Sequence, residues 1–364
     1  MIRRLLLVLT SVLLGVSLLA GADEPTYRGR TLKEWRLMLQ DDSKPERRQA
    51  ALLVIELLGA KDSATVQVLG RAVRTDKDAE VRRRSAQMLS NLGAEAREAM
   101  DDLAAAIKTD ADAGVRASAA GALASLGASG KAAVVVPVLI NGLKDKDAKV
   151  RVAAADAIAR LGPDGEPAVA DLITALSDGQ ALVRSSAAAA LGRIGPNAKE
   201  AVPALDKLLN SDRDAEVRKE AVLALGQLGS EAAGAVDGLT KMLRDGRADI
   251  RQRAALVIGT LGKDGSPAAP ALAEVLNDGD KAVRAQAVRA LAAVAGPSDT
   301  VLTTLSSRID DAAEDVRIAA IQELGQFGPK AKKALPALTA ASRDPRPGVS
   351  EAAKEAVKKI QATP

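Results

Sequence analysis

One pattern of residues recurs along this chain, from about Leu32 to the C-terminus, with a period of 33 to 35 residues. Its core reads D-x-x-x-x-V-R-x-x-A-x-x-x-L-x-x-L-G, as in DKDAKVRVAAADAIARLG and DRDAEVRKEAVLALGQLG. A period of this length is typical of repeat proteins, in which each repeat is one supersecondary unit that contacts only its neighbours. The chain is therefore expected to fold as a stack of about ten similar units.

Each copy of the pattern predicts an amphipathic α-helix. Counted from the Arg, apolar residues stand at −1, +7 and +10 and a small residue stands at +3, as with Val217, Leu225, Leu228 and Ala221. These intervals place the four side chains on one face of a helix. A Gly at +11 is expected to cap the end of the helix, because Gly enters the left-handed region at low cost. It is found at Gly93, Gly127, Gly162, Gly195, Gly229, Gly262 and Gly328.

Another helix is predicted upstream of each Asp, in segments such as AVPALDKLLN and PAAPALAEVLN. A Pro stands near its first turn, where the missing N–H costs nothing. Two helices joined by short turns form a hairpin that cannot bury its own apolar face, so neighbouring hairpins must stack. The predicted fold is an all-α, right-handed α-solenoid of about ten helical hairpins without strands.

The pattern resembles the HEAT-repeat family, particularly its short variants of the phycobilisome-lyase type. The resemblance rests on a Pro in the first helix, an Asp in the turn and Val-Arg opening the second helix, and it covers residues 31–361 after a short lead-in at 23–30. Ankyrin repeats share the length, but T-P-L-H is absent, and tetratricopeptide repeats expect aromatic residues that are missing here. The segment YRGRTLKEW also looks like the start of exported bacterial HEAT-repeat proteins. Within it, Thr31 and Glu34 predict a capping box.

An Asp stands six residues before the Arg position in every copy. In HEAT repeats this Asp and the following Arg form a ladder between repeats, and the resemblance implies the same here. The carboxylates are also expected to accept hydrogen bonds from N–H groups at the start of the second helix. The ladder residues are Asp76 and Arg82, Asp110 and Arg116, Asp145 and Arg151, Asp178 and Arg184, Asp212 and Arg218, Asp245 and Arg251, Asp278 and Arg284, and Asp311 and Arg317.

The same carboxylates have an alternative interpretation as cation sites. A second Asp often follows two residues later, as in Asp76 and Asp78 or Asp278 and Asp280. Calcium, however, takes about six to eight oxygen ligands, and no Glu stands at a fixed offset to supply a bidentate carboxylate. A structural role in the turn is therefore favoured, and neither a metal nor a small-molecule cofactor is expected.

Residues 1–22 have the features of a signal peptide. Two Arg precede an apolar stretch from Leu5 to Ala20, and A-G-A at residues 20–22 supplies the small residues that signal peptidase needs. Cleavage before Asp23 would leave 49 basic and 47 acidic residues, a net charge of +2. The apolar stretch is shorter than the roughly 20 residues of a membrane helix. The protein is therefore predicted to be exported, either periplasmic or extracellular, with an uncleaved N-terminal anchor as the alternative.

The chain contains no His and no Cys. Their absence excludes Ser-His-Asp and Cys-His nucleophilic sites and metal sites built on imidazole or thiolate. It also excludes the iron chemistry of deoxyhypusine-hydroxylase-type HEAT proteins, which depends on His-Glu motifs. Paired carboxylates remain, but they are interpreted as solvated helix faces and turn caps. We predict that the protein is not an enzyme, with an accessory lyase of the HEAT-like type as the alternative.

Without a predicted catalytic or metal site, the function is expected to lie in binding through the protein surface. In HEAT arrays the second helices line the concave side, so positions +1, +2, +5 and +9 from the Arg are candidates for partner contact. This face is mixed and mildly basic, which suits a protein segment or an anionic glycan. A nucleic acid is not expected, because the mature chain is nearly neutral and 1% aromatic. We predict a scaffold that binds a protein partner, with a purely structural envelope protein as the alternative. The candidate residues are Arg83, Arg84, Arg160, Arg193, Lys219, Arg253 and Arg289.

Overall fold

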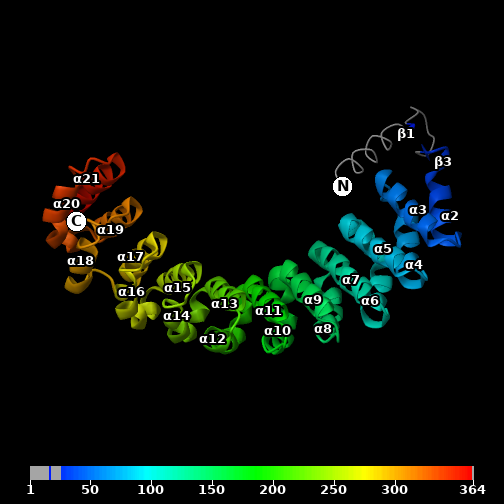
Figure 1. Cartoon of the computed structure of the whole chain (residues 1–364), viewed down its shortest axis with the longest axis horizontal. Helices are drawn as coiled ribbons and strands as arrows, with labels where there is room; N and C mark the ends of the chain where they lie inside the picture. Colours follow the sequence, from blue (N-terminus) through cyan, green and yellow to red (C-terminus); the bar gives the residue numbers. More distant parts are fainter. Residues whose placement is uncertain (1–15, 18–25, 363–364) are drawn as a thin grey trace. The chain divides into compact units, whose positions relative to one another are not determined.

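A computed structural model describes residues 16–17 and 26–362. Within these residues the α-helices form ten successive pairs, from α2 and α3 to α20 and α21 (Figure 1), and the predicted all-α solenoid is confirmed. Apart from Val16 and Ser17, the predicted signal peptide lies outside the described residues, as does its cleavage site. The chain divides into two compact units, one that ends at Asp171 and one that begins at Leu172.

The second helix of each pair has 13 to 15 residues, whereas several first helices have only seven. The first helices are α2 (Leu32–Asp41), α4 (Ser63–Thr75), α6 (Met100–Thr109), α8 (Ala132–Leu143), α10 (Val169–Ala175), α12 (Val202–Ser211), α14 (Val236–Met242), α16 (Ala269–Val275), α18 (Asp299–Ser306) and α20 (Leu335–Ala341). The second helices are α3 (Pro45–Leu57), α5 (Ala79–Leu92), α7 (Ala113–Leu126), α9 (Ala148–Leu161), α11 (Ala181–Ile194), α13 (Ala215–Leu228), α15 (Ala248–Thr260), α17 (Lys281–Ala295), α19 (Glu314–Gln326) and α21 (Pro347–Gln361).

The hairpins stack so that second helices of successive repeats lie side by side, as α5, α7 and α9 do in the N-terminal unit (Figure 1). The predicted apolar face points into this stack. Val217, Ala221, Leu225 and Leu228 of α13 are all fully buried. Each repeat thus adds a layer to a core that is continuous within its unit. A single hairpin could not exclude water from its own apolar face.

Glycine allows the second helices to approach closely. A Cβ built on Gly192 of α11 would lie 2.8 Å from the Cα of Ala224 in α13. On Gly325 of α19 it would lie 3.0 Å from the Cα of Ala356 in α21. Both distances are shorter than real Cβ contacts, so even Ala would push the helices apart. The register of these interfaces is therefore set by Gly at +8 facing Ala at +6 of the next repeat.

Sequence analysis missed a 3-10 helix of seven residues that joins one repeat to the next at six places. Side chains three apart eclipse in a 3-10 helix, so small residues at that spacing share one face. In η4, Ala198 and Ala201 are both fully buried, and the segment packs against α11 and α13. These helices are η1 (Gly93–Ala99), η3 (Gly162–Ala168), η4 (Gly195–Ala201), η5 (Gly229–Ala235), η6 (Gly262–Ala268) and η7 (Gly328–Ala334).

The first Gly of each 3-10 helix has a φ between +55° and +76°, so the predicted Gly at the end of the second helix is confirmed there. The prediction is wrong at Gly127, whose φ of −60° is helical. The chain turns instead within η2 (Gly127–Lys131), where Gly130 has a φ of +86°. A Cβ on Gly127 would lie 2.6 Å from a methyl carbon of Leu161. Close packing against the Leu161 side chain of the next repeat, not backbone conformation, therefore favours glycine at this position.

By length and composition alone, Ala113–Leu143 is apolar enough to cross a membrane. In the fold this segment comprises α7, the turn in η2 and α8. The two helices pack against each other and against α9, and Leu123 and Val135 are fully buried. Its hydrophobicity is therefore used by the repeat core.

The prediction of no strands is wrong near the N-terminus. The turn at Arg28 and Gly29 has φ values of +53° and +72°, as two-residue hairpin turns require. The Trp35 Nε1–H donates to the Tyr27 carbonyl oxygen at 3.3 Å, and both side chains are buried. This contact holds the hairpin against α2. The antiparallel strands are β1 (Val16–Ser17), β2 (Thr26–Tyr27) and β3 (Arg30–Thr31).

The predicted capping box at the start of α2 is confirmed. The Glu34 backbone N–H donates to Thr31 Oγ1 at 3.3 Å, and the Thr31 backbone N–H donates to the Glu34 carboxylate at 2.8 Å. Each side chain therefore satisfies a backbone donor that the first turn of the helix would leave free.

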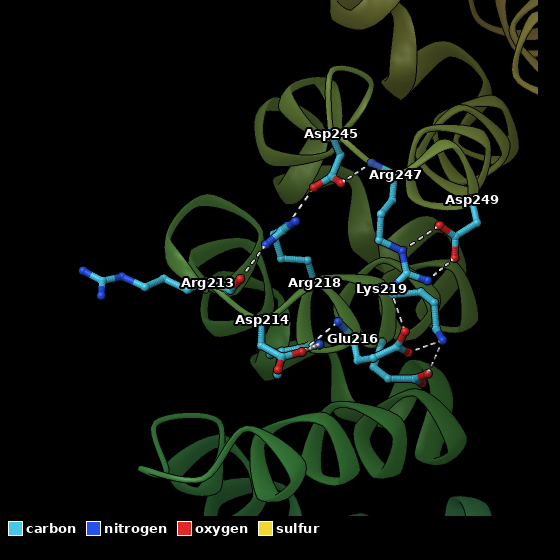
Figure 2. Close-up of polar contacts among 10 residues, drawn as sticks. Arg213, Asp214, Glu216, Arg218, Lys219, Asp245, Arg247 and Asp249 are labelled. Atoms are coloured by element: carbon cyan, nitrogen blue, oxygen red, sulfur yellow. Dashed lines mark hydrogen bonds and ion pairs between the residues drawn. The ribbon is translucent and has the colours of Figure 1, made fainter. Parts of the chain in front are cut away.

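Successive repeats are tied together by Arg–Asp ion pairs. Arg218 of α13 donates from Nε to Asp245 Oδ2 at 2.7 Å (Figure 2). Its Nη1 donates to the Asp212 carbonyl oxygen at 3.1 Å. The Arg thus joins the carboxylate of the next repeat to the main chain of its own repeat. Pairs of this kind are Arg48–Asp76, Arg82–Asp110 and Arg116–Asp145 in the N-terminal unit, and Arg184–Asp212, Arg218–Asp245, Arg251–Asp278, Arg284–Asp311 and Arg317–Asp344 in the C-terminal unit.

Two residues of the ladder stand next to the division between the units. Arg151 donates from Nη1 to the Asp145 carbonyl oxygen at 2.8 Å within the N-terminal unit. In the C-terminal unit, Asp178 accepts a hydrogen bond from the Gln180 N–H at 2.8 Å, and its carbonyl oxygen accepts one from Arg184 Nη1 at 2.8 Å. Both residues therefore make the contacts with their own repeat that the other copies make.

The two Asp residues of the turn have different roles. Asp76 Oδ1 accepts hydrogen bonds from Arg48 Nη2 at 2.7 Å and from the Asp78 N–H at 2.8 Å. Asp78 is the N-cap of α5, where its Oδ1 accepts from the Val81 N–H at 3.0 Å. In the part of the chain that the structure describes, no group of three or more acidic residues is arranged to hold a metal ion. The first Asp of the turn therefore bridges repeats and the second caps a helix.

We predict that Arg184→Ala lowers the free energy of unfolding by about 2 to 4 kcal/mol. The loss is large because the Asp212 side chain is only 4% exposed and would keep a buried charge without its bidentate partner. Urea unfolding followed by far-UV circular dichroism measures the change. Arg193→Ala, at an exposed position on the same helix, is the control and should change stability by less than about 0.5 kcal/mol. Equal midpoints for the two variants would contradict the structural role of Arg184.

The ladder also predicts sensitivity to acid. The hydrogen bond from Arg251 lowers the pKa of Asp278 below its ordinary 3.8, against burial, which raises it. Because the folded-state pKa lies below the unfolded-state value, the stabilisation is present above about pH 4 and is lost as the pH falls through the folded-state pKa. Urea midpoints should hold from pH 7 to about pH 5 and fall below about pH 4. Arg251→Gln should show a shallower fall, and an equal fall in both proteins would contradict the assignment.

Candidate partner-binding surface

The candidate residues lie on the second-helix face, by which we mean positions +1, +2, +5 and +9 from the Arg position in α3 to α21. The ladder Arg itself points between repeats, so these four positions lie away from the ladder. Arg160, Arg193 and Arg289 are exposed, whereas Arg253 and Lys219 are half-buried. The face is therefore accessible along both units, although its charge is partly neutralised by neighbouring residues.

Arg83 and Arg84 of α5 share one carboxylate. Arg83 Nη2 and Arg84 Nε lie 2.6 and 2.7 Å from Glu80 Oε1. The hydrogen bonds from Arg83 and then Arg84 lower the pKa of Glu80 below its ordinary value. One carboxylate neutralises one of two guanidinium groups, so this part of the second-helix face keeps one net positive charge.

Lys219 of α13 belongs to an ionic network at the sixth and seventh repeats (Figure 2). Its Nζ pairs with Glu216, whose other oxygen accepts a hydrogen bond from Arg247 Nη1 at 2.6 Å. Arg247 also forms a bidentate pair with Asp249, at 3.0 and 2.7 Å. Five of the ten second helices have an N-cap Asp where Arg247 stands, whereas this repeat has an ion pair between repeats instead of a side-chain cap. Lys219 is therefore a weaker candidate for partner contact than its sequence position suggests.

The remaining Arg candidates differ in their surroundings. Arg160 Nη2 donates to the Gly121 carbonyl oxygen of the preceding second helix at 3.3 Å. Arg289 lies near Glu323, and burial raises the pKa of that carboxyl although Arg289 lowers it. Within the described residues Arg193 makes no hydrogen bond or ion pair. Arg193 is thus the candidate whose charge is most available to a partner.

Exposed leucines are a second feature of the second helices, and sequence analysis did not single them out. Among the described residues, six large hydrophobic side chains are exposed, and four of them lie on second helices. Leu53 and Leu256 are 55% and 49% exposed, and both stand at position +5. Their spacing from the Arg would have identified them, because +5 lies opposite the buried positions. The four residues are Leu53, Leu57, Leu182 and Leu256.

A groove of about 330 Å³ runs between α3 and α5 on this face. Leu52 and Met88 are buried at its floor, and Leu53 stands at its wall. A smaller hollow of about 150 Å³ shares Met88 with it and continues toward the ends of both helices. The lining residues of the larger part are Leu52, Leu53, Glu56, Arg83, Arg84, Gln87, Met88 and Asn91.

A second groove, of about 290 Å³, lies between α19 and α21 at the other end of the described chain. Gln322, Gln326, Glu355 and Lys359 form its walls, and Gly325 lies at its base. Its lining has no large aliphatic side chain, whereas Leu52, Leu53 and Met88 line the α3–α5 groove beside its polar residues. The two grooves therefore favour different side chains.

Two clefts on the ladder edge are lined by residues that already have structural roles. One, of about 320 Å³, includes Arg48 and Asp76, and the other, of about 400 Å³, includes Arg184 and Asp212. The guanidinium and carboxylate groups in these clefts are paired with each other. A ligand would have to compete with the ion pairs that join the repeats, so these clefts are poorer candidates than the second-helix face.

The family profile described as HEAT repeats matches residues 32–124, 100–178, 136–226, 169–259, 236–311 and 302–364. No curated protein matches the chain. Among solved structures, importin beta in an ammonium sulfate condition has a TM-score of 0.60 at 16% identity over 90% of this chain and 51% of its own. Kap95p, in a structure concerned with its binding to RanGDP, has a TM-score of 0.59 at 13% identity over 90% and 50%. The chain thus spans about half the length of these two proteins, and the likeness shows the fold alone.

The profile matches together extend from residue 32 to residue 364, over nearly all of the ten helix pairs. The Arg–Asp pairs between repeats agree with what the sequence resemblance implied, with the refinement that each carboxylate takes the Arg of the preceding repeat. This chain belongs to the HEAT-repeat family.

Proposed function

We propose that this protein is a non-enzymatic scaffold that binds another protein through its second-helix face, the face that is concave in HEAT arrays. The observation that carries the proposal is the distribution of exposed large hydrophobic side chains. Of the six in the described residues, Leu53, Leu57 and Leu256 lie at positions +5 and +9 of this face, which also carries the exposed Arg160, Arg193 and Arg289. Apolar side chains flanked by Arg are the composition of protein–protein interfaces. Leu53 and Leu57 stand four residues apart on α3, so their side chains are neighbours on one face of that helix.

The comparisons support the class of function. HEAT-repeat solenoids are typical protein-binding scaffolds, and the structural neighbour Kap95p binds RanGDP. The two alternatives, an accessory lyase and a purely structural envelope protein, have less support. A lyase would need a site with convergent polar groups, whereas the polar groups of the second-helix face are dispersed over many repeats. A structural rod would not need neighbouring exposed leucines such as Leu53 and Leu57 of α3.

We propose further that the protein acts outside the cytoplasm, as an exported HEAT-repeat protein with short repeats. The support is the sequence of residues 1–22, with two Arg, an apolar stretch and A-G-A at residues 20–22. A chain without Cys needs no disulfide formation after export, since its stability rests on packing and ion pairs. The partner is then expected among envelope or extracellular proteins.

The absence of Cys makes the binding face testable by single-Cys cross-linking. We expect a photo-cross-linker on Arg193→Cys or Leu256→Cys of residues 23–364 to capture the same protein from a detergent extract of the host envelope. The same reagent on Lys207→Cys, exposed on the first helix α12, is the control and should capture none of it. Mass spectrometry identifies the product. Equal capture at all three positions would contradict binding through the second-helix face.

Export predicts a defined N-terminus. When the full chain is expressed in a bacterium with a Sec pathway, the protein in the periplasm or medium should begin at Asp23, as read by N-terminal sequencing. Replacing Ala20 and Ala22 by Arg should block processing and leave the precursor with the membranes, because signal peptidase requires small residues at those positions. A cytoplasmic protein that keeps residues 1–22 would contradict the proposal.

A further inference from the structure

The α3–α5 groove differs from the other second-helix interfaces in the residues at positions +8 and +6. In α11 and α13 these are Gly192 and Ala224, which touch. In α3 and α5 they are Glu56 and Met88, and both line the hollow. Side chains of this size keep the two helix backbones from meeting as closely as Gly and Ala allow. This groove is therefore shaped by Glu56 and Met88, whereas the α19–α21 groove lies at a Gly–Ala contact and lacks side chains of this kind.

The floor of the groove is apolar and deformable. Leu52 is 1% and Met88 8% exposed, so the bottom is sealed, whereas Leu53 at the wall is 55% exposed. Met is unbranched and fits irregular surfaces, which suits a site that must receive another side chain. An aliphatic group placed against Leu53 and Met88 would remove both from water. The floor thus favours an apolar anchor over a polar one.

The length of the groove limits what can lie in it. On α5 the lining extends from Arg83 to Leu92, when the smaller hollow is included. Nine helical steps at about 1.5 Å each make a trough of roughly 14 Å. A helix laid along it would place side chains i, i+4 and i+7 at about 0, 6 and 10 Å, all within the trough. Two to three turns of an amphipathic helix therefore match its length.

The charges at the rim determine which helix fits. Arg83 and Arg84 stand at one end with only Glu80 between them, so one positive charge is unbalanced. At the other end Glu56 and Lys61 are both exposed and carry opposite charges, so that end has no net charge. A carboxylate on the bound helix would neutralise the remaining positive charge of Arg83 and Arg84. A basic helix would be repelled there.

We propose that the α3–α5 groove binds an amphipathic helix of a partner protein, with aliphatic side chains on Leu53 and Met88 and a carboxylate beside Arg83 and Arg84. This inference rests on the proposed scaffold function and assigns one recognition element to the first two repeats. The rest of the second-helix face then contributes additional area along the same partner.

The probe is a fluorescein-labelled synthetic helix of about eleven residues, with Leu at i, i+4 and i+7 and Glu on the remaining face. Fluorescence anisotropy with the chain from residue 23 to 364 should show saturable binding that weakens as salt is raised. A peptide with Lys in place of Glu, and one with Ser in place of Leu, should bind at least about tenfold more weakly. No binding of the acidic peptide at about 1 mM, or equal binding of the basic one, would overturn the proposal.

Variants of the protein locate the site. Leu53→Asp should weaken binding of the acidic peptide by about tenfold or more, since it places a charge at the apolar wall. The matched control is Leu37→Asp, which changes an exposed leucine of the first helix α2 and should leave binding within about twofold. Arg84→Ala should weaken binding by about threefold and reduce its salt dependence. Both leucines are exposed, so both variants should fold, and circular dichroism checks this.

The outcomes separate this inference from the proposed function. If Leu53→Asp has no effect on the peptide while Arg193→Cys still cross-links a partner, the groove is not the recognition element but the scaffold function stands. If Leu53→Asp abolishes peptide binding and also reduces cross-linking from Arg193→Cys, the cross-linked partner binds the α3–α5 groove through a helix, as proposed. If Leu37→Asp weakens binding of the peptide as much as Leu53→Asp does, the peptide adheres non-specifically to exposed leucine and the proposal fails.

Discussion

Each repeat of this chain depends on its neighbour, because a two-helix hairpin leaves one apolar face open to water. Two contacts close that face. The Arg–Asp pair holds the turns of successive repeats, as between Arg82 and Asp110, and the Gly–Ala contact sets the spacing of the second helices, as between Gly192 and Ala224. The ion pair has a direction, since the guanidinium group also binds the main chain of its own repeat. Together they specify the next repeat's position at both ends of the second helix.

Stacking therefore uses the charges that the sequence repeats most regularly, and fewer charges remain for a partner. The ladder Arg and Asp are paired between repeats, and Glu80 and Glu216 neutralise part of the Arg and Lys on the second-helix face. The face that remains is less basic than the sequence predicted and carries exposed leucines. A partner recognised by such a face must offer apolar side chains as well as acidic ones.

Period and polarity were enough to predict the local structure of the repeats. The sequence predicted the ten helix pairs, the buried positions of α13 and the capping box at Thr31, because each depends on residues close in sequence. Gly127 was assigned wrongly, because its contact with Leu161 comes from the next repeat and mimics a cap in the pattern. The short strands escaped prediction because two residues carry no periodicity. The grooves did so because they form between side chains of two neighbouring repeats, and the pattern within one repeat does not place those side chains relative to each other.

A surface repeated without change would offer the same contacts at every step and could not place a partner at one position along the array. The residues that every copy shares are used for stacking, so specificity must come from positions where the copies differ. The +5 position is Leu in α3, α13 and α15, Arg in α17 and Gly in α7. At +8 and +6, Glu56 and Met88 replace the Gly and Ala found between α11 and α13, and a groove lies there. Under the proposed scaffold function, we therefore expect recognition to depend on positions where the copies differ.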